Sequence, residues 1–166
     1  RFPDAPETVK MACGENPKRV YGDRGGPSTR MGNLRDHRSV FLSAQAKKKD
    51  WEEYEKEREA GEEPDMPERD LDAETLIGIL DGRFLTQVHC YRADDMLSLL
   101  QLADEFGFSI RSFHHALEAY KIRDILADRN VAVSTWADWW GFKMEAYDGI
   151  PYNAALLTES GAKAII

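Results

Sequence analysis

The sequence predicts an α/β fold in which short parallel strands alternate with helices. Three observations support this class. Short apolar runs recur along the chain, segments of helical periodicity lie between them, and one strand plus one helix occupies about twenty to thirty residues. The apolar runs are typical of parallel strands that are covered by helices. A doubly wound sheet and a barrel both fit this pattern, and periodicity alone does not choose between them.

The N-terminal part is predicted to hold one strand and one long helix. Residues 8–12 form an apolar patch that suits a strand, and the Gly- and Pro-containing stretch 14–19 indicates a loop. From residue 33 to residue 58 the spacing is helical, with an apolar face at its start and an almost wholly charged continuation. Residues 61–67 should end this helix.

A regular alternation of elements is predicted after Pro67. A helix should open near residue 72, with Asp70 or Asp72 as its N-cap. The expected strands are 84–89, 109–113, 131–134 and one beginning at 163, and the expected helices between them are 94–106, 117–128 and 152–160.

The negative charge is concentrated in one segment. The formal net charge is −8, yet residues 50–74 hold thirteen acidic and three basic residues, which leaves the rest of the chain at +2. This balance argues against nucleic-acid binding. No apolar run approaches the roughly 18 residues that span a membrane, so membrane insertion is not expected either.

The two cysteines, Cys13 and Cys90, show no CxxC spacing and are far apart in sequence. The spacing does not indicate a disulfide framework, and both are expected to be small buried residues at strand ends.

Three histidines follow two consecutive predicted strands. His89 closes the first, and His114 and His115 close the next. In α/β folds the carboxyl ends of parallel strands gather ligands and catalysts, and a neutral imidazole donates well to a borderline divalent cation. The alternative is a set of hydrogen-bonded structural histidines.

These segments resemble the metal-dependent amidohydrolase superfamily, in particular its imidazolonepropionase-like and prolidase-like members. Residues 88–95 (VHCYRADD) resemble that family's fifth strand and residues 113–118 (FHHALE) its sixth, while residues 9–14 (VKMACG) are similar to its fourth. Residues 14–22 and 134–140 look like those of secreted or periplasmic members, some of which are fused to a propeller domain. The resemblance covers most of the chain except the acidic segment.

The resemblance implies a portion of a TIM (β/α)8 barrel with parallel strands and outer helices. Residues 1–166 would form part of a single barrel domain covering about strands 4 to 8, with 45–70 as a charged helical insertion and linker. Strands 1–3 and the end of strand 8 would be missing, which agrees with a length below the roughly 250 residues of a complete barrel.

The resemblance also implies a site. His89 and His115 would be metal ligands, and Lys10 would bridge two ions if its amine is carboxylated; alternatively Lys10 forms a strand-end salt bridge. His115 is preferred over His114, which is expected to point to the other side of its strand. The metal is expected to be Zn, as one or two ions, with Fe, Mn and Ni as alternatives. The family's His-x-His pair is absent, and its general-base Asp is expected beyond Ile166.

The implied reaction is hydrolysis of C–N bonds in cyclic amide, amidine or peptide-like substrates by metal-activated water. The parent protein is expected to be an active enzyme and this segment alone to be inactive. The residues expected near the substrate are Tyr91, Arg92, His114, Trp136 and Asp138. Arg92 suits a helix-start salt bridge with Asp94 or Asp95 as well as a substrate carboxylate, and Trp136, Trp139 and Trp140 suit a barrel rim as well as a pocket.

Two other readings stay open at the level of sequence. One is a catalytically inactive barrel fragment or degenerate homologue with a structural or partner-binding role, in which the acidic helix around 51–63 is an interaction arm. The other is a doubly wound domain whose histidines lie too far apart to share an ion. The expected partners are a small-molecule or peptide-like substrate and, since a half-barrel exposes edge strands, a second copy or the remainder of the barrel.

Overall fold

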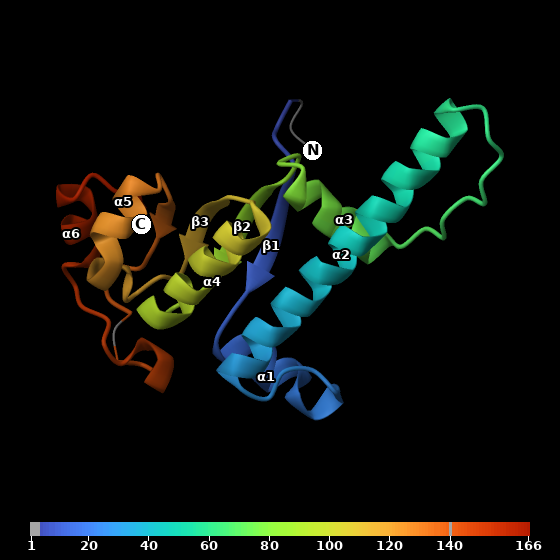
Figure 1. Ribbon diagram of the computed structural model, residues 1–166. Helices are drawn as coiled ribbons and strands as arrows, with labels where there is room; N and C mark the ends of the chain where they lie inside the picture. The colour runs from blue at the N-terminus through green and yellow to red at the C-terminus, as the bar shows by residue number, and fades with distance from the viewer. Residues whose placement is uncertain (1–3, 140) are drawn as a thin grey trace.

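Five parallel strands form one sheet in the order in which they occur along the chain. The computed structural model describes residues 4–139 and 141–166 (Figure 1). Within them the strands are β1 (Thr8–Ala12), β2 (Leu85–His89), β3 (Ile110–His114), β4 (Ala132–Ser134) and β5 (Ala164–Ile165).

The strand order identifies the kind of α/β fold. A doubly wound sheet reverses its strand order at a switch point, whereas a barrel adds each new strand beside the previous one. Here every strand pairs in parallel with its sequence neighbours, without reversal. The chain therefore has the architecture of consecutive strands of a (β/α)8 barrel, and the doubly wound alternative is wrong.

Helices of very different length connect the strands. The α-helices are α1 (Glu15–Tyr21), α2 (Arg30–Glu59), α3 (Leu71–Leu80), α4 (Ala93–Phe106), α5 (Arg123–Asp128) and α6 (Asn153–Glu159). Single 3₁₀ turns occur at η1 (Gly22–Arg24), η2 (Ala119–Ile122) and η3 (Met144–Ala146). The helix expected to open near residue 72 begins at Leu71, and Asp70 is its N-cap, accepting a 3.0 Å hydrogen bond from the Ala73 amide.

The two faces of the sheet differ in polarity. Val88, Phe113 and Val133 are fully buried in the core that the helices cover. Because side chains alternate along a strand and paired residues of parallel strands point the same way, the opposite face carries Lys10, paired with Gln87, and His89, paired with His114. In a barrel this second, polar face is the interior.

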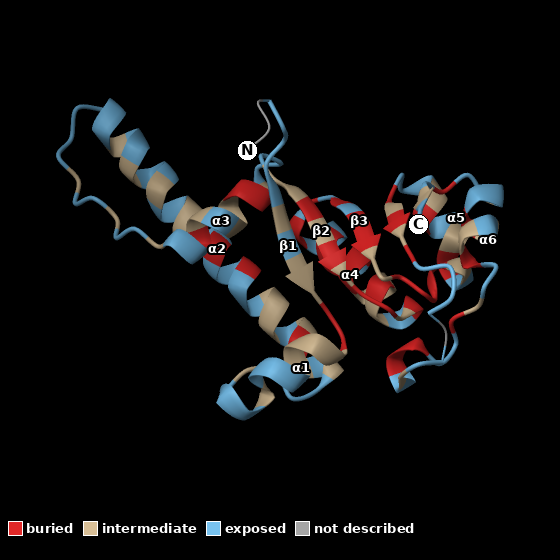
Figure 2. Ribbon diagram, turned by 180° about the vertical axis from the view of Figure 1, so that it is seen from behind, coloured by how far each residue is buried: buried red, intermediate tan, exposed pale blue. Residues whose placement is uncertain are grey.

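Only the first half of helix α2 contributes buried residues, while Lys48 in its second half joins the residue after α3, Asp81, through a 2.6 Å hydrogen bond. Phe41 is fully buried, stacks on Phe108 with ring centroids 4.7 Å apart and lies 5.3 Å from the Phe106 ring. Beyond Ala44 no residue of the helix is buried, and Figures 1 and 2 show this part, with the segment that follows it, projecting away from the sheet. That 45–70 is an insertion into the barrel domain stays a prediction.

Two local predictions are wrong. Residues 14–19 do not form a loop, since α1 spans most of them. Pro17 is tolerated there because the amides of a helix's first turn have no intrahelical acceptor. Residues 117–128 do not form one helix: the 3₁₀ turn η2 precedes α5, which begins only at Arg123.

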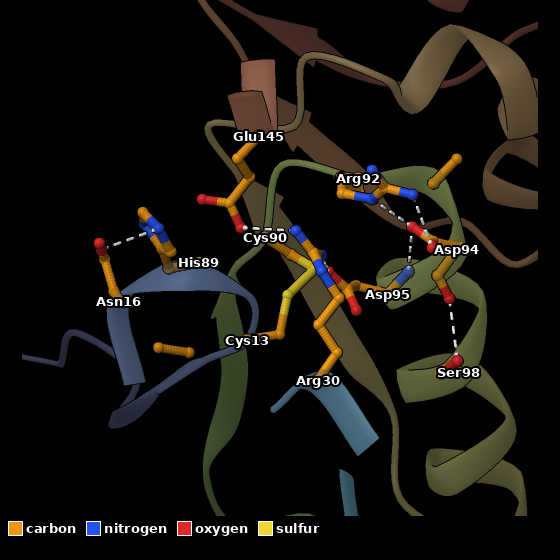
Figure 3. The surroundings of a disulfide bond; sticks show 12 residues. Cys13, Asn16, Arg30, His89, Cys90, Arg92, Asp94, Asp95, Ser98 and Glu145 are labelled. Carbon is orange, nitrogen blue, oxygen red and sulfur yellow. Dashed lines mark hydrogen bonds and ion pairs between the residues drawn. A yellow bond between two sulfur atoms is a disulfide. The ribbon is translucent and has the colours of Figure 1, made fainter. Parts of the chain in front are cut away.

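Cys13 and Cys90 form a disulfide, which their spacing in the sequence did not indicate, although both are buried beside strand ends as expected. Each cysteine lies just past a strand end, Cys13 after β1 and Cys90 after β2, and parallel pairing brings the two ends together with Cα atoms 5.3 Å apart (Figure 3). The sequence separation of 77 residues hid a contact that only the strand register creates.

Within the described ranges, no helix is long and apolar enough to cross a membrane. The longest, α2, has a mostly charged surface.

The burial of one face of α2 in the core predicts contrasting effects of two adjacent substitutions. Phe41→Ala should lower the free energy of unfolding by about 3–5 kcal/mol, because it removes a fully buried ring from the core. Leu42→Ala, whose side chain is 53% exposed, should change it by less than about 1 kcal/mol. Urea denaturation followed by circular dichroism measures both, and equal losses would contradict the packing of α2.

The disulfide makes a second prediction. Reduction, or a Cys13→Ser/Cys90→Ser double substitution, should lower the free energy of unfolding by about 4 kcal/mol, because the closed loop of 77 residues no longer restricts the unfolded chain. Urea denaturation with and without dithiothreitol measures this effect, and the double variant should not respond to the reductant. Two free thiols in the purified, unreduced chain would show that the bond does not form.

Candidate functional site

Two histidines from neighbouring strands meet at the carboxyl end of the sheet. His89 is the last residue of β2, and His115 follows the last residue of β3. Their ring centroids are 4.7 Å apart. This contact arises from the parallel pairing of β2 and β3, in which His89 is the partner of His114. The convergence predicted from two strand ends is therefore present.

The backbone turns sharply at His115. Its φ of 60° lies in the left-handed region, which residues other than glycine seldom adopt. The next residues close a tight turn, in which the Leu117 amide donates to the His115 carbonyl at 2.8 Å. His115 thus leaves the strand and is no longer subject to its alternation of side chains.

The prediction that His114 points away from the candidate ligands is wrong, because it assumed that His115 still alternates with His114 along the strand. His114 shares the face of its register partner His89 and of Ser112, whose hydroxyl lies 3.0 Å from His114 Nε2. The centroids of the His114 and His115 rings are 6.4 Å apart. Three imidazoles therefore gather at this end of the sheet, because the left-handed turn brings His115 back toward the face that His114 already occupies.

The electrostatic surroundings favour neutral imidazoles. Desolvation, followed by the charges of His115 and Lys143, lowers the pKa of His89 to about 4. Desolvation and the charge of Lys10 lower the pKa of both His114 and His115. Neutral rings keep one nitrogen lone pair each, which is the form that binds a cation.

Lys10 faces this group from β1. Its side chain is open to solvent, and partial desolvation beside the sheet lowers its pKa. Its charge acts on all three imidazoles. A lowered pKa increases the fraction of free amine, which is the form that carboxylation requires. The role of Lys10 as a metal ligand, and its carboxylation, stay predictions.

Both candidate ligands have hydrogen-bonding neighbours. The Asn16 side-chain nitrogen lies 3.0 Å from His89 Nε2, and the Trp136 indole Nε1 donates to His115 Nδ1 at 2.9 Å. Asn16 comes from α1, in the stretch expected to be a loop, and no sequence pattern pointed to it as a site residue. Trp136 was expected near the substrate, and it lies directly on a candidate ligand.

Aromatic rings enclose His115. Tyr91 stacks on one side of it with centroids 5.8 Å apart, and Trp136 stacks on it at 5.4 Å. Trp139 stacks on Trp136 at 4.6 Å, and Phe142 connects Trp139 back to Tyr91 at 5.2 and 6.3 Å. These five rings, His115, Tyr91, Trp136, Trp139 and Phe142, are called the aromatic circuit below.

Lys143 adds a charge at the edge of the circuit. Its ammonium group lies 4.1 Å from the centroid of the Tyr91 ring, within range of a cation–π interaction.

The remaining predicted substrate residues differ in position. Arg92 donates from Nε and Nη2 in two 2.9 Å hydrogen bonds to Asp94. This is the helix-start salt bridge that was one of the two alternatives for Arg92. Its role toward a substrate stays a prediction. Asp138 is exposed on the loop after β4. Trp140, also expected on this loop, lies outside the described residues.

A buried carboxylate that sequence reasoning missed holds the end of this loop. Glu145 is 3% exposed, and its Oε1 accepts from the Glu15 amide at 2.8 Å while Oε2 accepts from Lys143 at 3.1 Å. Gly14 makes this approach possible, because a Cβ there would lie 1.9 Å from Glu145 Oε1. Figure 3 shows Glu145 beside Arg30 and the disulfide.

A buried amide fixes the turn that carries His115. Asn153, 1% exposed, donates to the Ala116 carbonyl at 3.0 Å and to the Thr135 hydroxyl at 2.8 Å, and it accepts from the Tyr120 amide at 2.9 Å. One side chain of α6 therefore joins the segments that follow β3 and β4. An Asn at the start of a helix carries no sequence signal of such a role.

The disulfide does not form a second metal site. Ligand atoms of Cys13, Cys90 and Asp95 lie within 4.8 Å of one another. Both sulfur atoms are already bonded to each other, so neither is a thiolate, and Asp95 is paired with Arg30. This group of three residues is therefore not available to hold a metal ion.

Comparison with known proteins gives a consistent picture. No family model matches the chain. Amidohydrolase tasK of Hapsidospora irregularis is 36% identical over 165 residues, which cover 95% of this chain and 17% of that protein. The crystal structure of an amidohydrolase from Thermotoga maritima MSB8 superposes with a TM-score of 0.83 at 35% identity, covering 96% of this chain and 40% of that one.

The chain thus spans about a sixth of the first relative and two fifths of the second. Both likenesses extend over nearly the whole chain, and the structural one includes the parallel sheet with its outer helices. Over nearly its whole length the chain is therefore similar to part of an amidohydrolase, and its sheet has the architecture of part of a (β/α)8 barrel.

Proposed function

We propose that this chain is the metal-binding part of a metal-dependent amidohydrolase that cleaves C–N bonds. The observation that carries the proposal is the meeting of His89 and His115, with ring centroids 4.7 Å apart, at the carboxyl end of a barrel-type sheet. In barrel enzymes this end of the sheet holds the active site. Because the chain spans only part of its relatives, the activity is proposed for the whole protein.

The donor set fits a divalent cation. Two imidazoles with lowered pKa values come from adjacent strand ends, and His114 lies beside them. His89 and His115 would hold the ion, and Lys10 would join them if its amine is carboxylated. Imidazole suits Zn best, with Fe, Mn and Ni as alternatives. When bound, such an ion lowers the pKa of a water ligand and polarises a carbonyl group.

The chain's own residues would prepare this end of the barrel for a substrate. Glu145 and Asn153 fix the segments around the site through buried hydrogen bonds. Tyr91 and Trp136 offer flat apolar surfaces beside His115, and the His114 ring lies near it, with centroids 6.4 Å apart. Asp138, exposed on the loop after β4, would supply a further polar group. A cyclic amide, an amidine or a peptide-like compound combines a planar C–N group with apolar parts, and this is the substrate class we propose.

The disulfide supports a location outside the reducing cytosol. Disulfides persist in secreted and periplasmic proteins and are rare where glutathione keeps thiols reduced. The Cys13–Cys90 bond is buried, with the two residues 3% and 0% exposed. We propose on this ground that the protein is secreted or periplasmic.

Metal content tests the proposal. The purified chain, dialysed against Zn²⁺ and then against metal-free buffer, should retain about one or two ions by elemental mass spectrometry. A His89→Ala/His115→Ala double variant should retain none, because it lacks both imidazole donors.

The fourth histidine supplies the matched control. His37 comes from α2, outside the group of three imidazoles, and contacts the Ala12 carbonyl through Nε2 at 3.0 Å. His37→Gln keeps an amide that donates to this carbonyl, so it should retain the same metal as the wild type. Metal that is equally absent from wild type and double variant, or equally present in both, would reject the site and favour a structural or partner-binding barrel.

A further inference from the structure

The hydrogen bond between Trp136 and His115 has only one chemical interpretation. An indole Nε1 carries a proton and has no acceptor capacity, so it is the donor in this 2.9 Å contact. His115 Nδ1 must therefore be the acceptor, and in a neutral ring the proton then resides on Nε2. The contact fixes both the tautomer of His115 and the use of its lone pair.

We propose that Trp136 is a lid whose hydrogen bond to His115 excludes metal binding, so that an ion and the indole compete for the same imidazole. This inference rests on the metal site proposed above, because it needs His115 to be a ligand. It adds a positioning residue that controls access to that ligand. Binding of a divalent cation would displace the indole, and the displaced indole would uncover His115.

The competition does not depend on which nitrogen binds the metal. If the ion binds Nδ1, it takes the lone pair that the indole uses. If it binds Nε2, the ring proton must move to Nδ1, and two N–H groups would then face each other across 2.9 Å with no acceptor between them. In either case the hydrogen bond is lost and Trp136 leaves its present position.

Asn16 differs from Trp136 in this respect. Its amide faces His89 Nε2 at 3.0 Å, and an amide carries both a donor and an acceptor. A half-turn of the side chain would present its oxygen to an Nε2–H group, so His89 can bind through Nδ1 while Asn16 stays in place. Trp136 has no such alternative, which is why the lid function is assigned to it alone.

The surrounding contacts allow the indole to move without unfolding the barrel. Trp136 is 36% and Trp139 45% exposed, and both lie on the loop after β4. The loop is fixed on both sides of them. Before it, the Thr135 amide donates to the Ile165 carbonyl at 2.9 Å and the Thr135 hydroxyl accepts from Asn153; after it, the Gly141 amide donates to the Ala146 carbonyl at 2.8 Å.

His115 would keep its position when the lid leaves. Tyr91, which is 5% exposed, stacks on the ring, and Asn153 holds the Ala116 carbonyl next to it. The opened face would thus present one ordered imidazole beside an aromatic wall. Because Thr135 and Gly141 are anchored, movement of the indole would leave the position of His115 unchanged.

Nuclear magnetic resonance of the indole N–H groups tests the lid during a Zn²⁺ titration. The Trp136 Nε1–H signal, assigned by its loss in Trp136→Phe, should start downfield because it is hydrogen-bonded to a nitrogen. It should move upfield and exchange faster with water as Zn²⁺ binds. The Trp51 signal, from the distant arm of α2, should not move.

Zn²⁺ affinity measured by competition with a chelating dye gives a second readout. Trp136→Phe keeps an aromatic ring but cannot donate, so it should bind Zn²⁺ about fivefold more tightly, corresponding to the loss of one competing hydrogen bond of about 1 kcal/mol. Trp139→Phe is the matched control, because Trp139 lies in the same stack and the hydrogen bond to His115 comes from Trp136; this variant should bind as the wild type does.

The outcomes separate this inference from the metal site itself. If wild type and both variants bind Zn²⁺ equally and the Trp136 signal does not move, the metal site stands and the lid is rejected. Equal tightening in both variants would also reject it, since a general loosening of the stack would explain the gain. Absence of Zn²⁺ from all three proteins would reject the metal site and the lid together.

Discussion

The parallel pairing of β2 with β3 is the constraint on which the rest of the site depends. It sets His89 beside His114, and the left-handed turn that follows brings His115 within 4.7 Å of His89. A slip of one residue would turn the imidazoles toward the helices and the apolar residues toward the polar face. Buried Val88 and Phe113 oppose that slip, so the register of the core also determines the geometry of the site.

A second cross-strand connection reinforces this pairing. The Cys13 amide donates to the His89 carbonyl at 2.9 Å, and the side chain of Cys13 is bonded to Cys90, the residue after His89. Main chain and side chain therefore tie the end of β1 to the same point of β2. Helix α1 begins two residues after Cys13 and carries Asn16 to the His89 ring, so the disulfide also helps to place a neighbour of the candidate ligand.

The sequence predicted the elements that have a clear period and missed those that depend on contacts. Strands 84–89 and 109–113 were placed within one residue of β2 and β3, because short apolar runs between turn residues are a local signal. The disulfide, the Glu145 contact with Gly14 and the role of Asn153 arise from segments 77, 131 and 37 positions apart, which no local pattern reports. The orientation of His114 was predicted wrongly because the alternation of side chains was assumed to continue to His115, which lies beyond the end of the strand.

The need of buried polar atoms for hydrogen-bond partners explains why side chains of the chain itself occupy the imidazoles of such a site. A half-buried imidazole lone pair without a partner costs free energy, so neighbouring donors occupy it when no ligand is present. Here those donors are Asn16 and Trp136, one adaptable and one able only to donate. A ligand must offer more than the contact it replaces, and the replaced group must have somewhere to go. Trp136 meets the second condition, because it is 36% exposed and, among the described residues, its ring contacts are with His115 and Trp139. A fully buried donor would have no room to leave, and His115 would then be a structural residue.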